Sequence, residues 1–587
     1  MKFLKVFCVL ISLLSLSCWA QVQYQIRIEQ PEHHLAQVQM RFEQPTVGAV
    51  TLHLPAWRSG KYQIMDLANG VSLFNAKMAD GTAVPFVKTE KSSWRLQVPV
   101  AGELVVSYQI YANQLGGRTR HIDETHAYIN ASAYLMYSEH TKALPLQVEL
   151  QVPQGWKSYS GMQRGAEEHS FIAANYDVVA DSPIETGVSQ YRSFTVDGRK
   201  YELVLWGEGN YNPDQMQTDL SKLVAQADSI WSGYPYQNYL FIVHATDGVR
   251  GATEHLNSTV IQRDRFSFAS RTDYLEFLST ASHELVHTWN VKAYRPAELV
   301  PYDYLNPNYS RLLWISEGST SYFQNQLLLR AGLMSKTEFY ADIAKRLQRF
   351  LQTPGRELQS VAESSFDNWI ALGGDHALNF SVNIYSEGYL ASWLLDLWLL
   401  EHSDREASYR ALHNQLYQRF GKTTAFTAED VQKIALDLTG SSLQPFWATQ
   451  VEQPLNFQPA ELLKAFGLEW QPGKEQEIYT GVSSAEHMGF SLLKTVERGS
   501  AAWNAGLTAE DLVVAVNGLQ LKKGLAERLK DFKAGDKVLL NFFRQGRLQQ
   551  TELVLQQKAK GPGQVVPVAK PSRAQKAMHQ AWLGVAL

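Results

Sequence analysis

The sequence predicts a multidomain α+β protein, because the spacing of its apolar residues changes twice along the chain. From Gln21 to about Gly198 apolar and polar residues alternate, as in strands with one buried face. Helical spacing then dominates from Tyr274 to about Phe466. Short apolar runs bounded by turn residues return from Glu477. The length of 587 residues is enough for roughly two to four domains.

These changes divide the chain after residue 20 into four sections. The first is expected to be a β-sandwich-like domain. The second combines a buried strand at 239–243 and a further strand at 253–261 with long helices at 312–329 and 384–400. The third holds short strands, and the last, rich in Lys, Gly and Pro, is expected to be a loosely held tail with a short docking helix at 574–583. The sections are residues 21–198, 199–466, 477–557 and 558–587.

Residues 1–20 have the composition of a secretory signal peptide. Lys2 and Lys5 precede an apolar run from Val6 to Leu16, and Ala20 offers a small residue before the cleavage site. We therefore expect an exported protein, periplasmic or secreted. The apolar run is too short to span a membrane, and no later 18-residue apolar stretch exists, so no transmembrane segment is expected in the mature chain.

The cysteine content and the charge narrow the expected chemistry and partners. Cleavage after Ala20 removes both cysteines, Cys8 and Cys18, which leaves no disulfide and no thiol chemistry. An alternative keeps Cys18 as the acylated N-terminus of a lipoprotein, although Ser15 stands where such signals usually carry Leu. The formal net charge is −4 and no basic run is present, so no nucleic-acid partner is expected.

The strongest functional signal is the pentad 283–287, which reads His-Glu-Leu-Val-His inside a helical pattern. Residues four apart on a helix lie about 40° apart around its axis, so His283 and His287 face the same way and can share one Zn²⁺. Glu284 projects about 100° away, where it can polarise a zinc-bound water. Structural zinc sites are usually closed by four protein ligands, often cysteines, which the mature chain lacks. We therefore expect one catalytic Zn²⁺ per chain; the alternative is a solvated helix with two unrelated histidines.

Glu317 is the candidate third zinc ligand. It lies 30 residues after His287, at the start of the next long helix, a spacing that suits a helix, a loop and a helix returning to one metal. Trp314 and Tyr322 flank it. The alternative is a carboxylate that only stabilises the first helical turn through the helix dipole.

Together these segments resemble the M61 family of glycyl aminopeptidases. Residues 283–292 resemble the zinc-helix signature of that family, and residues 314–318 resemble its second zinc helix. Residues 251–255, Gly-Ala-Thr-Glu-His, look like the strand with which gluzincin aminopeptidases hold the amino terminus of a substrate. Residues 181–184 also resemble a family segment. The resemblance covers nearly the whole mature chain and implies a thermolysin-like (gluzincin) catalytic domain with a helical part at 199–466.

The resemblance implies a role for each matched residue. Glu284 would be the general base and then the general acid. Glu254 would pair with the α-ammonium group of the substrate; the alternative is an ordinary surface glutamate. The remaining roles are zinc binding by His283, His287 and Glu317, and peptide binding along the strand edge by the backbone of Gly251 and Ala252.

A tyrosine is also expected at the site, because gluzincin aminopeptidases place one before an x-Lys-Gly. The matching segment is 385–388, Tyr-Ser-Glu-Gly, in which Glu387 replaces the usual lysine. Tyr385 would donate a hydrogen bond to the tetrahedral oxyanion. Tyr389 is the fallback one turn later, and a buried core tyrosine is the alternative. Thr253 stands where related motifs carry Met or Leu, which could change the pocket for the first side chain.

Residues 477–557 resemble a PDZ domain. Strands are expected at 490–493, 512–516 and 538–542, with a tight turn at Asn517-Gly518. The resemblance implies a carboxylate-binding loop at 487–490, before the first of these strands. A peptide C-terminus is therefore a second expected partner, beside peptide substrates with a free N-terminus.

The sequence therefore predicts an exported zinc metallo-aminopeptidase, a peptide hydrolase. The resemblance implies removal of N-terminal Gly or Ala. Two alternatives remain. One is an endopeptidase that uses the same zinc site, and the other is a protein that binds peptides through its PDZ domain and has a vestigial metal site.

Overall fold

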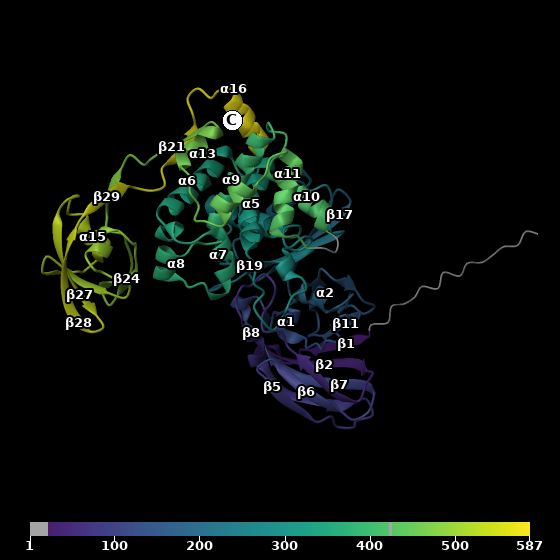
Figure 1. Ribbon diagram of the computed structural model, residues 1–587. Coiled ribbons are helices and arrows are strands. Elements are labelled where there is room, and N and C mark those ends of the chain that lie inside the picture. The colour runs from purple at the N-terminus through teal and green to yellow at the C-terminus, as the bar shows by residue number, and fades with distance from the viewer. Residues whose placement is uncertain (1–20, 422–424) are drawn as a thin grey trace, which may run out of the picture. The chain divides into compact units, whose positions relative to one another are not determined.

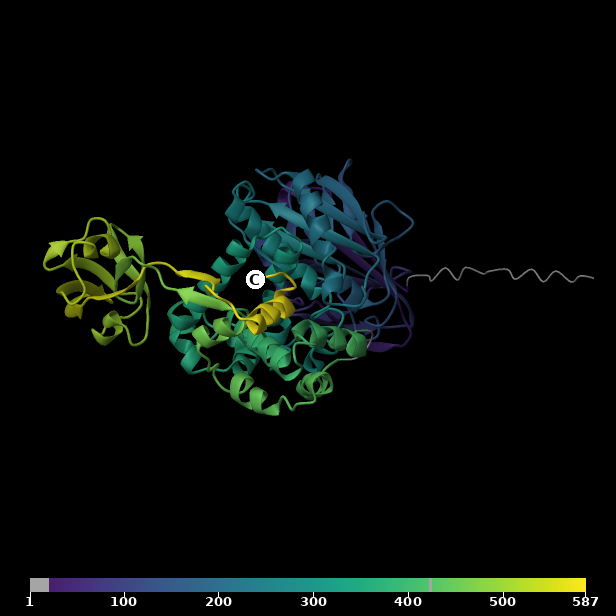
Figure 2. The same cartoon turned by 90° about the horizontal axis from the view of Figure 1, so that it is seen from above.

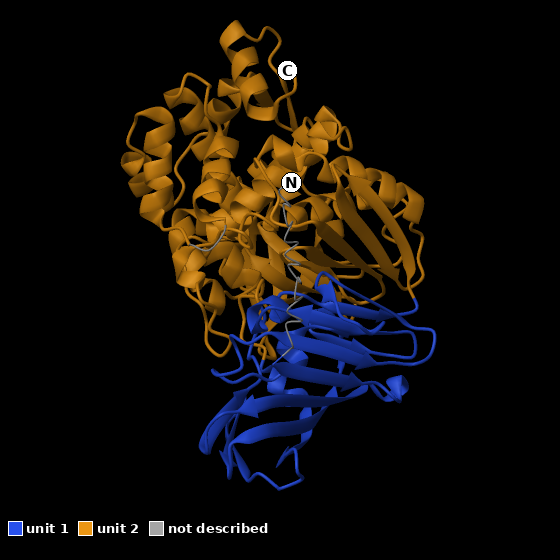
Figure 3. Ribbon diagram, turned by 90° about the vertical axis from the view of Figure 1, so that its right-hand side faces the viewer, with its two compact units in different colours: residues 1–58, 66–188 blue, residues 59–65, 189–587 orange. Residues whose placement is uncertain are grey.

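The computed structural model describes residues 21–421 and 425–587, and the chain divides into two compact units (Figure 3). Unit 1 contains the residues up to 58 and residues 66–188, and unit 2 contains residues 59–65 and 189–587. The short segment 59–65 is therefore part of unit 2 although its neighbours in sequence belong to unit 1. The signal peptide and the Cys18 alternative fall outside the described residues.

Unit 1 is built mainly of strands, as the alternating pattern predicts. A seven-stranded sheet has the order β13-β14-β11-β1-β2-β7-β4, a three-stranded sheet the order β3-β6-β5, and a five-stranded sheet the order β12-β15-β10-β9-β8. Phe74 of the first sheet stacks on Trp94 of the second with centroids 5.4 Å apart, so side chains of two sheets share one core. The strands are β1 (Val22–Arg27), β2 (Leu35–Gln44), β3 (Gly48–His53), β4 (Val71–Met78), β5 (Phe86–Glu90), β6 (Ser93–Val98), β7 (Gly102–Tyr111), β8 (Asn113–Gln114), β9 (Arg120–Ile122), β10 (His126–Ile129), β11 (Leu146–Gln151), β12 (Lys157–Ser160), β13 (Gln163–Arg164), β14 (Ser170–Ala173) and β15 (Ile184–Gly187), with short helices α1 (Ala131–Tyr134) and α2 (Tyr176–Ala180).

Strand β2 shows why the alternating pattern is reliable in this unit. Its apolar residues Ala36, Val38, Met40 and Phe42 are all buried, while the residues between them are more exposed. All ten residues of β2 pair with β7, so a slip by one residue would turn every apolar side chain outward.

Unit 2 begins with a five-stranded sheet of order β16-β17-β18-β20-β19. Strands β17, β18 and β20 run parallel, and β19 is antiparallel at the edge. Two predictions are corrected here: the predicted boundary at residue 198 falls inside the β16–β17 hairpin, and the single strand predicted at 253–261 is a hairpin. The first error places a domain boundary at the Asp197-Gly198 turn of a hairpin, and the second misses the turn at residues 255–257. The strands are β16 (Gln190–Val196), β17 (Arg199–Trp206), β18 (Asn238–Ala245), β19 (Gly251–Glu254) and β20 (Ser258–Arg263).

Helices form the rest of this part of unit 2 (Figure 1). The predicted helices at 312–329 and 384–400 correspond to the π-helical turn η6 (Trp314–Ser319) followed by α5 (Thr320–Arg330), and to α9 (Ser386–His402). Trp231 and Trp289 stack at 4.4 Å in the large apolar core beneath them. The other helices are α3 (Pro213–Val224), α4 (Arg271–His287), α6 (Lys336–Leu351), α7 (Val361–Phe366), α8 (Gly374–Phe380), α10 (Tyr409–Phe420), α11 (Ala428–Thr439), α12 (Gln444–Phe446) and α13 (Pro459–Ala465).

The C-terminal strands form a further sheet with its own small core. Its strands follow the order β23-β24-β25-β27-β28, and β26 pairs with β25 through the predicted Asn517-Gly518 turn. The predicted carboxylate-binding loop at 487–490 lies before β24, as the two-residue turn of the β23–β24 hairpin in which His487 pairs with Phe490. Met488 at its tip is 83% exposed. The elements are β23 (Val482–His487), β24 (Phe490–Val496), α14 (Ala501–Asn504), β25 (Leu512–Val516), β26 (Leu519–Gln520), α15 (Leu525–Leu529), β27 (Lys537–Arg544) and β28 (Arg547–Val554).

Residues 558–587 contain paired strands and a packed helix, which corrects the prediction of a loosely held tail. The chain returns through β29 (Gln556–Ala559) and β30 (Gln564–Pro567), which pair with β22 (Gln476–Tyr479) and β21 (Leu468–Gln471). The predicted docking helix is present as α16 (Arg573–Leu583), which lies against the other helices of unit 2 (Figure 2). Its Trp582 is fully buried and stacks on Trp393 at 5.1 Å. The composition of this segment, rich in Lys, Gly and Pro, did not indicate that Trp582 would be buried.

None of the helices in the described part of the chain has the length and apolar character needed to span a membrane.

Gly318 provides the first test of the packing in unit 2. A Cβ added there would lie 2.3 Å from the backbone carbon of Gly388, so η6 and α9 approach with no room for a side chain. We expect Gly318→Ala to cost about 1–3 kcal/mol of stability or more, because backbone cannot move aside as a side chain can. A lowered melting temperature by circular dichroism is the expected result. Gly373→Ala, whose Cβ meets nothing within 4 Å, is the control; equal melting temperatures for the two variants would contradict the steric argument.

Candidate active site

Helix α4 places the two predicted histidine ligands side by side. Ser270 caps its first turn by accepting a hydrogen bond from Asp273 N, and the helix runs through to His287. The Nε2 atoms of His283 and His287 lie 3.0 Å apart. This is the common orientation that the four-residue spacing predicts.

The other ring nitrogens are held by oxygen atoms that can only accept hydrogen bonds. His283 Nδ1 lies 2.8 Å from Gln324 Oε1, and His287 Nδ1 lies 2.9 Å from the backbone oxygen of Asn290. Each Nδ1 must therefore carry a proton, so Nε2 is the atom of each ring that can bind a metal ion. This tautomer is the one a metal ion requires.

Glu317 completes the group from the π-helical turn η6. Its Oε2 lies 3.6 Å from His283 Nε2 and 3.3 Å from His287 Nε2, and its side chain is almost fully buried. Tyr62 donates a hydrogen bond to Oε1 at 2.6 Å, which leaves Oε2 for the histidines. The three potential ligand atoms all lie within 4.8 Å of one another. Two neutral imidazoles and a carboxylate, each oriented by a further partner, fit the donor set of a catalytic zinc site.

The electrostatics of the group follow from this buried carboxylate. Burial alone would raise the pKa of Glu317, but His287 and His283 hold it well below its ordinary value. Burial lowers the pKa of His287, yet the charges of Glu317, Glu254 and Glu284 outweigh that effect and raise it to about 9. A proton therefore occupies the place of a cation, and an arriving metal ion would displace it.

Glu254 and Glu284 lie within electrostatic reach of the same centre. Both raise the pKa of His287 and of Tyr385. Glu254 ends the edge strand β19, after Gly251 and Ala252, and is 5% exposed, so it is not the ordinary surface glutamate of the alternative interpretation. The structure thus gathers the predicted ligands, the predicted base and the predicted amine-binding carboxylate around one point.

Gly60, from the segment 59–65, packs directly on the Glu254 carboxylate. A Cβ at this position would lie 2.4 Å from Glu254 Oε1, and the residue has a φ of +76°, which favours glycine. The segment therefore contacts both the predicted metal ligand Glu317, through Tyr62, and the predicted amine-binding residue Glu254, through Gly60.

The position of Tyr385 favours it over Tyr389 as the predicted oxyanion donor. The Tyr385 ring lies 6.0 Å from the ring of His283, at the start of α9, where Asn383 Oδ1 accepts hydrogen bonds from the first backbone amides. Desolvation and the charges of Glu317, Glu254 and Glu284 raise the pKa of Tyr385 well above its ordinary value, so it remains a donor. Tyr389 instead packs in the core against Tyr322 and Trp393.

The sequence interpretation missed four residues that support the site: Gln324, Asn290, Tyr62 and Gly60. Gln324 follows Glu317 by seven residues, two helical turns later, which is a signal that helical spacing could have offered. Asn290 acts through its backbone oxygen and carries no side-chain signal. Tyr62 lies far before Glu317 in sequence and Gly60 far before Glu254, so only the fold brings each pair together.

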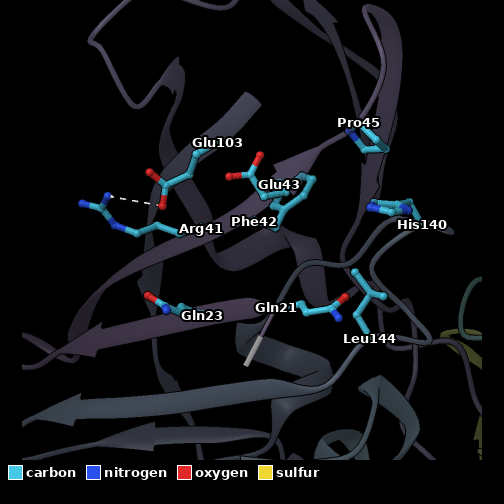
Figure 4. Close-up of a pocket in the computed structure, with 9 residues that line it drawn as sticks. All are labelled: Gln21, Gln23, Arg41, Phe42, Glu43, Pro45, Glu103, His140 and Leu144. Carbon is cyan, nitrogen blue, oxygen red and sulfur yellow. Dashed lines mark ion pairs between the residues drawn. The ribbon is translucent and has the colours of Figure 1, made fainter. Parts of the chain in front are cut away.

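A separate cavity of about 440 Å³ lies in unit 1 and is drawn in Figure 4. Arg41 and Glu103 form an ion pair there, 3.9 Å apart. None of the predicted site residues lines it. Its lining residues are Gln21, Gln23, Arg41, Phe42, Glu43, Pro45, Glu103, His140 and Leu144.

Sequence and structure comparisons assign the family. Residues 23–188 match the model of the peptidase M61 N-terminal domain, and residues 276–391 match that of M61 glycyl aminopeptidase. The chain carries both of these M61 peptidase domains. The predicted zinc metallo-aminopeptidase of this family is thereby confirmed as the class of enzyme.

A solved structure extends the likeness of this M61 peptidase to almost its full length. The crystal structure of an aminopeptidase N family protein from Idiomarina loihiensis superposes with a TM-score of 0.89 and 27% identity, covering 96% of this chain and 100% of that chain. An M1 zinc metallopeptidase from Deinococcus radiodurans reaches a TM-score of 0.48 at 13% identity, covering 75% of this chain and 95% of that one. No curated protein matches the M61 peptidase at the level of sequence.

Glu387, the residue that replaces the usual lysine, generates a prediction on pH. Burial raises the pKa of its carboxyl from 4.5 to about 8, although Arg356 lowers it. Between these two pH values the folded protein holds a proton that the unfolded chain releases, so the free energy of unfolding falls as pH rises through this window.

We therefore expect Glu387→Gln to remove this loss of stability with rising pH. Relative to the wild type, the melting temperature of the variant should be higher at pH 8 than at pH 5. Glu401→Gln, at an exposed position of the same helix, is the control and should show no such difference. A Glu387→Gln effect that is the same at both pH values would mean that the carboxyl is already ionised in the folded protein.

Proposed function

We propose that this M61 peptidase is an exported zinc-dependent aminopeptidase that removes N-terminal residues, Gly or Ala, from peptides. The observation that carries the proposal is the position of Glu254, within electrostatic reach of the predicted zinc ligands and at the end of an edge strand. A buried carboxylate beside the centre suits a substrate ammonium group, which fixes the distance from the chain end to the reacting bond. The Gly or Ala preference rests on the family description, and export rests on the sequence of residues 1–20.

The reaction follows from the roles of the side chains. A bound Zn²⁺, held by His283, His287 and Glu317, would polarise the scissile carbonyl and lower the pKa of the attacking water toward about 7. Glu284 takes the proton from that water and passes it to the nitrogen of the leaving amine. Tyr385 donates a hydrogen bond to the oxygen that becomes negative in the tetrahedral state.

Substrate binding uses the edge of the five-stranded sheet. Among the described strands, β19 pairs with β20 on one side only, so its other edge is suited to an extended peptide. Gly251 and Ala252 would supply the backbone groups for this pairing, and Glu254 would receive the α-ammonium group. We further propose that the catalytic part of unit 2 is thermolysin-like. We also propose that residues 477–557 form a PDZ domain whose ligand is the C-terminus of a peptide.

The endopeptidase alternative uses the same zinc ligands and base but does not need Glu254. The two activities therefore differ in their response to the substrate terminus. An aminopeptidase cleaves peptides with a free amine and spares N-acetylated ones, whereas an endopeptidase accepts both.

The first test of the mechanism is Glu284→Gln. We expect the release of 4-nitroaniline from Gly- and Ala-p-nitroanilide to fall by about 10²–10⁴-fold, because the general base is lost while the zinc ligands remain. Metal analysis should show unchanged zinc content. Glu276→Gln, at an exposed position earlier on α4, is the matched control and should keep its activity. Wild-type protein that holds zinc but cleaves only N-blocked peptides would shift the assignment to an endopeptidase.

The second test concerns the support of Glu254. We expect Gly60→Ala to lower kcat/KM for free-amine substrates by about 10- to 100-fold, because the added methyl displaces the carboxylate that positions the ammonium group. Gly248→Ala is a matched control, since Gly248 has a nearly equal φ of +74° but nothing within 4 Å of its Cβ. Equal losses in the two variants would show that backbone strain, and not the contact with Glu254, is responsible.

A further inference from the structure

A second cluster of metal-ligating side chains lies in unit 1, at the hairpin formed by β9 and β10. His121 is in β9, His126 begins β10, and Asp123 is in the turn between them. Glu185 of the neighbouring strand β15 lies beside His126. One ligand atom from each of His121, Asp123 and His126 lies within 4.8 Å of the other two, the same criterion that the predicted catalytic ligands meet.

His126 is oriented as metal-binding histidines are. Its Nδ1 lies 2.7 Å from Glu185 Oε1, and both side chains are fully buried. The carboxylate can only accept, so Nδ1 carries the proton and Nε2 presents its lone pair. A carboxylate behind a histidine is the common second-shell arrangement at metal sites, because it fixes the tautomer and raises the basicity of the ligand.

The Nε2 atom of His126 lies next to a second imidazole, at the separation found in the predicted catalytic pair. His126 Nε2 lies 2.9 Å from His121 Nδ1, and the corresponding distance between His283 and His287 is 3.0 Å. Two nitrogens that each lie about 2.1 Å from one ion are separated by about 3.0–3.4 Å. The same distance also suits a hydrogen bond between the two rings, so the separation alone does not decide between them.

Asp123 adds an oxygen on the same side. Its Oδ1 accepts hydrogen bonds from the backbone amides of Thr125 and His126, at 2.8 and 3.0 Å, and from the Thr125 hydroxyl. These bonds fix the carboxylate plane and direct Oδ2 toward His121 Nδ1, 3.9 Å away. The turn therefore orients a carboxylate oxygen toward the histidine pair before any ion arrives.

We propose that His121, His126 and Asp123 bind a divalent transition-metal ion, with Glu185 holding His126 in place. Two imidazoles and one carboxylate form a mixed nitrogen and oxygen set that suits ions such as Zn²⁺, with water in the open positions. The side chains of His121 and Asp123 keep 12% and 22% of their surface exposed, so an ion can reach them from solvent. The ion would join β9, the turn and β10, and would stabilise unit 1 without taking part in the proposed peptide hydrolysis.

The test uses the full mature chain with the predicted catalytic ligands removed by His283→Ala and His287→Ala, so that it does not depend on the proposed function. We expect this double variant to bind about one Zn²⁺ per chain by metal analysis after dialysis in a zinc buffer. We also expect Zn²⁺ to raise its melting temperature, because the ion binds only the folded hairpin. The wild type should bind about two.

Further variants in the same background assign the ion to the cluster. His121→Ala should abolish the remaining zinc binding. Asp123→Asn should weaken zinc binding but keep a side-chain oxygen that accepts the hydrogen bonds of the turn. Glu185→Gln should weaken it about 10- to 100-fold. His140→Asn, at an exposed histidine of unit 1 outside the cluster, should leave zinc binding unchanged.

A double variant that is folded by circular dichroism but binds no zinc would overturn the proposal, and the two rings would then share only a hydrogen bond. Zinc binding that persists after both His121→Ala and Asp123→Asn would also overturn it, because the ion would lie elsewhere.

Discussion

The burial of the Glu317 carboxylate against the two imidazoles of α4 is the interaction on which the catalytic arrangement depends. A charge removed from water is costly unless partners replace the lost solvation. Here His283 and His287 of α4 and Tyr62 of the segment 59–65 supply those partners. The negative charge in turn raises the pKa of His287 and Tyr385, so one buried group sets the protonation of its neighbours.

Close backbone approaches make this geometry possible. Gly318 follows Glu317 directly and touches Gly388, three residues after Tyr385, so one glycine contact fixes the distance between the turn that carries the ligand and the helix that carries the proposed donor. The close contact of Gly60 with the Glu254 carboxylate likewise fixes the position of that side chain. Protein interiors are packed too densely for these contacts to shift independently, which is why single methyl groups are expected to disturb the site.

Both histidine clusters orient their imidazole rings through hydrogen bonds, but the groups that accept these hydrogen bonds differ. In the predicted catalytic pair an amide oxygen and a backbone oxygen hold the outer ring nitrogens, whereas His126 of unit 1 is held by a carboxylate. All three partners accept hydrogen bonds only through oxygen, and all turn the opposite ring nitrogen inward. The carboxylate adds a full negative charge, which strengthens its histidine as a donor to a cation.

The sequence alone determined many of the elements and the residues whose roles depend on local spacing. The four-residue spacing of His283 and His287 on α4 set the direction of two imidazoles, and alternation along β2 set its buried face, because helices and strands have fixed periods. Tertiary structure decided what joins distant parts of the chain: the contacts of Tyr62 and Gly60, the oxygen of Asn290, the burial of Trp582 and the pairing of Glu185 with His126. Such contacts depend on how whole elements pack, and no period within a single element records that packing.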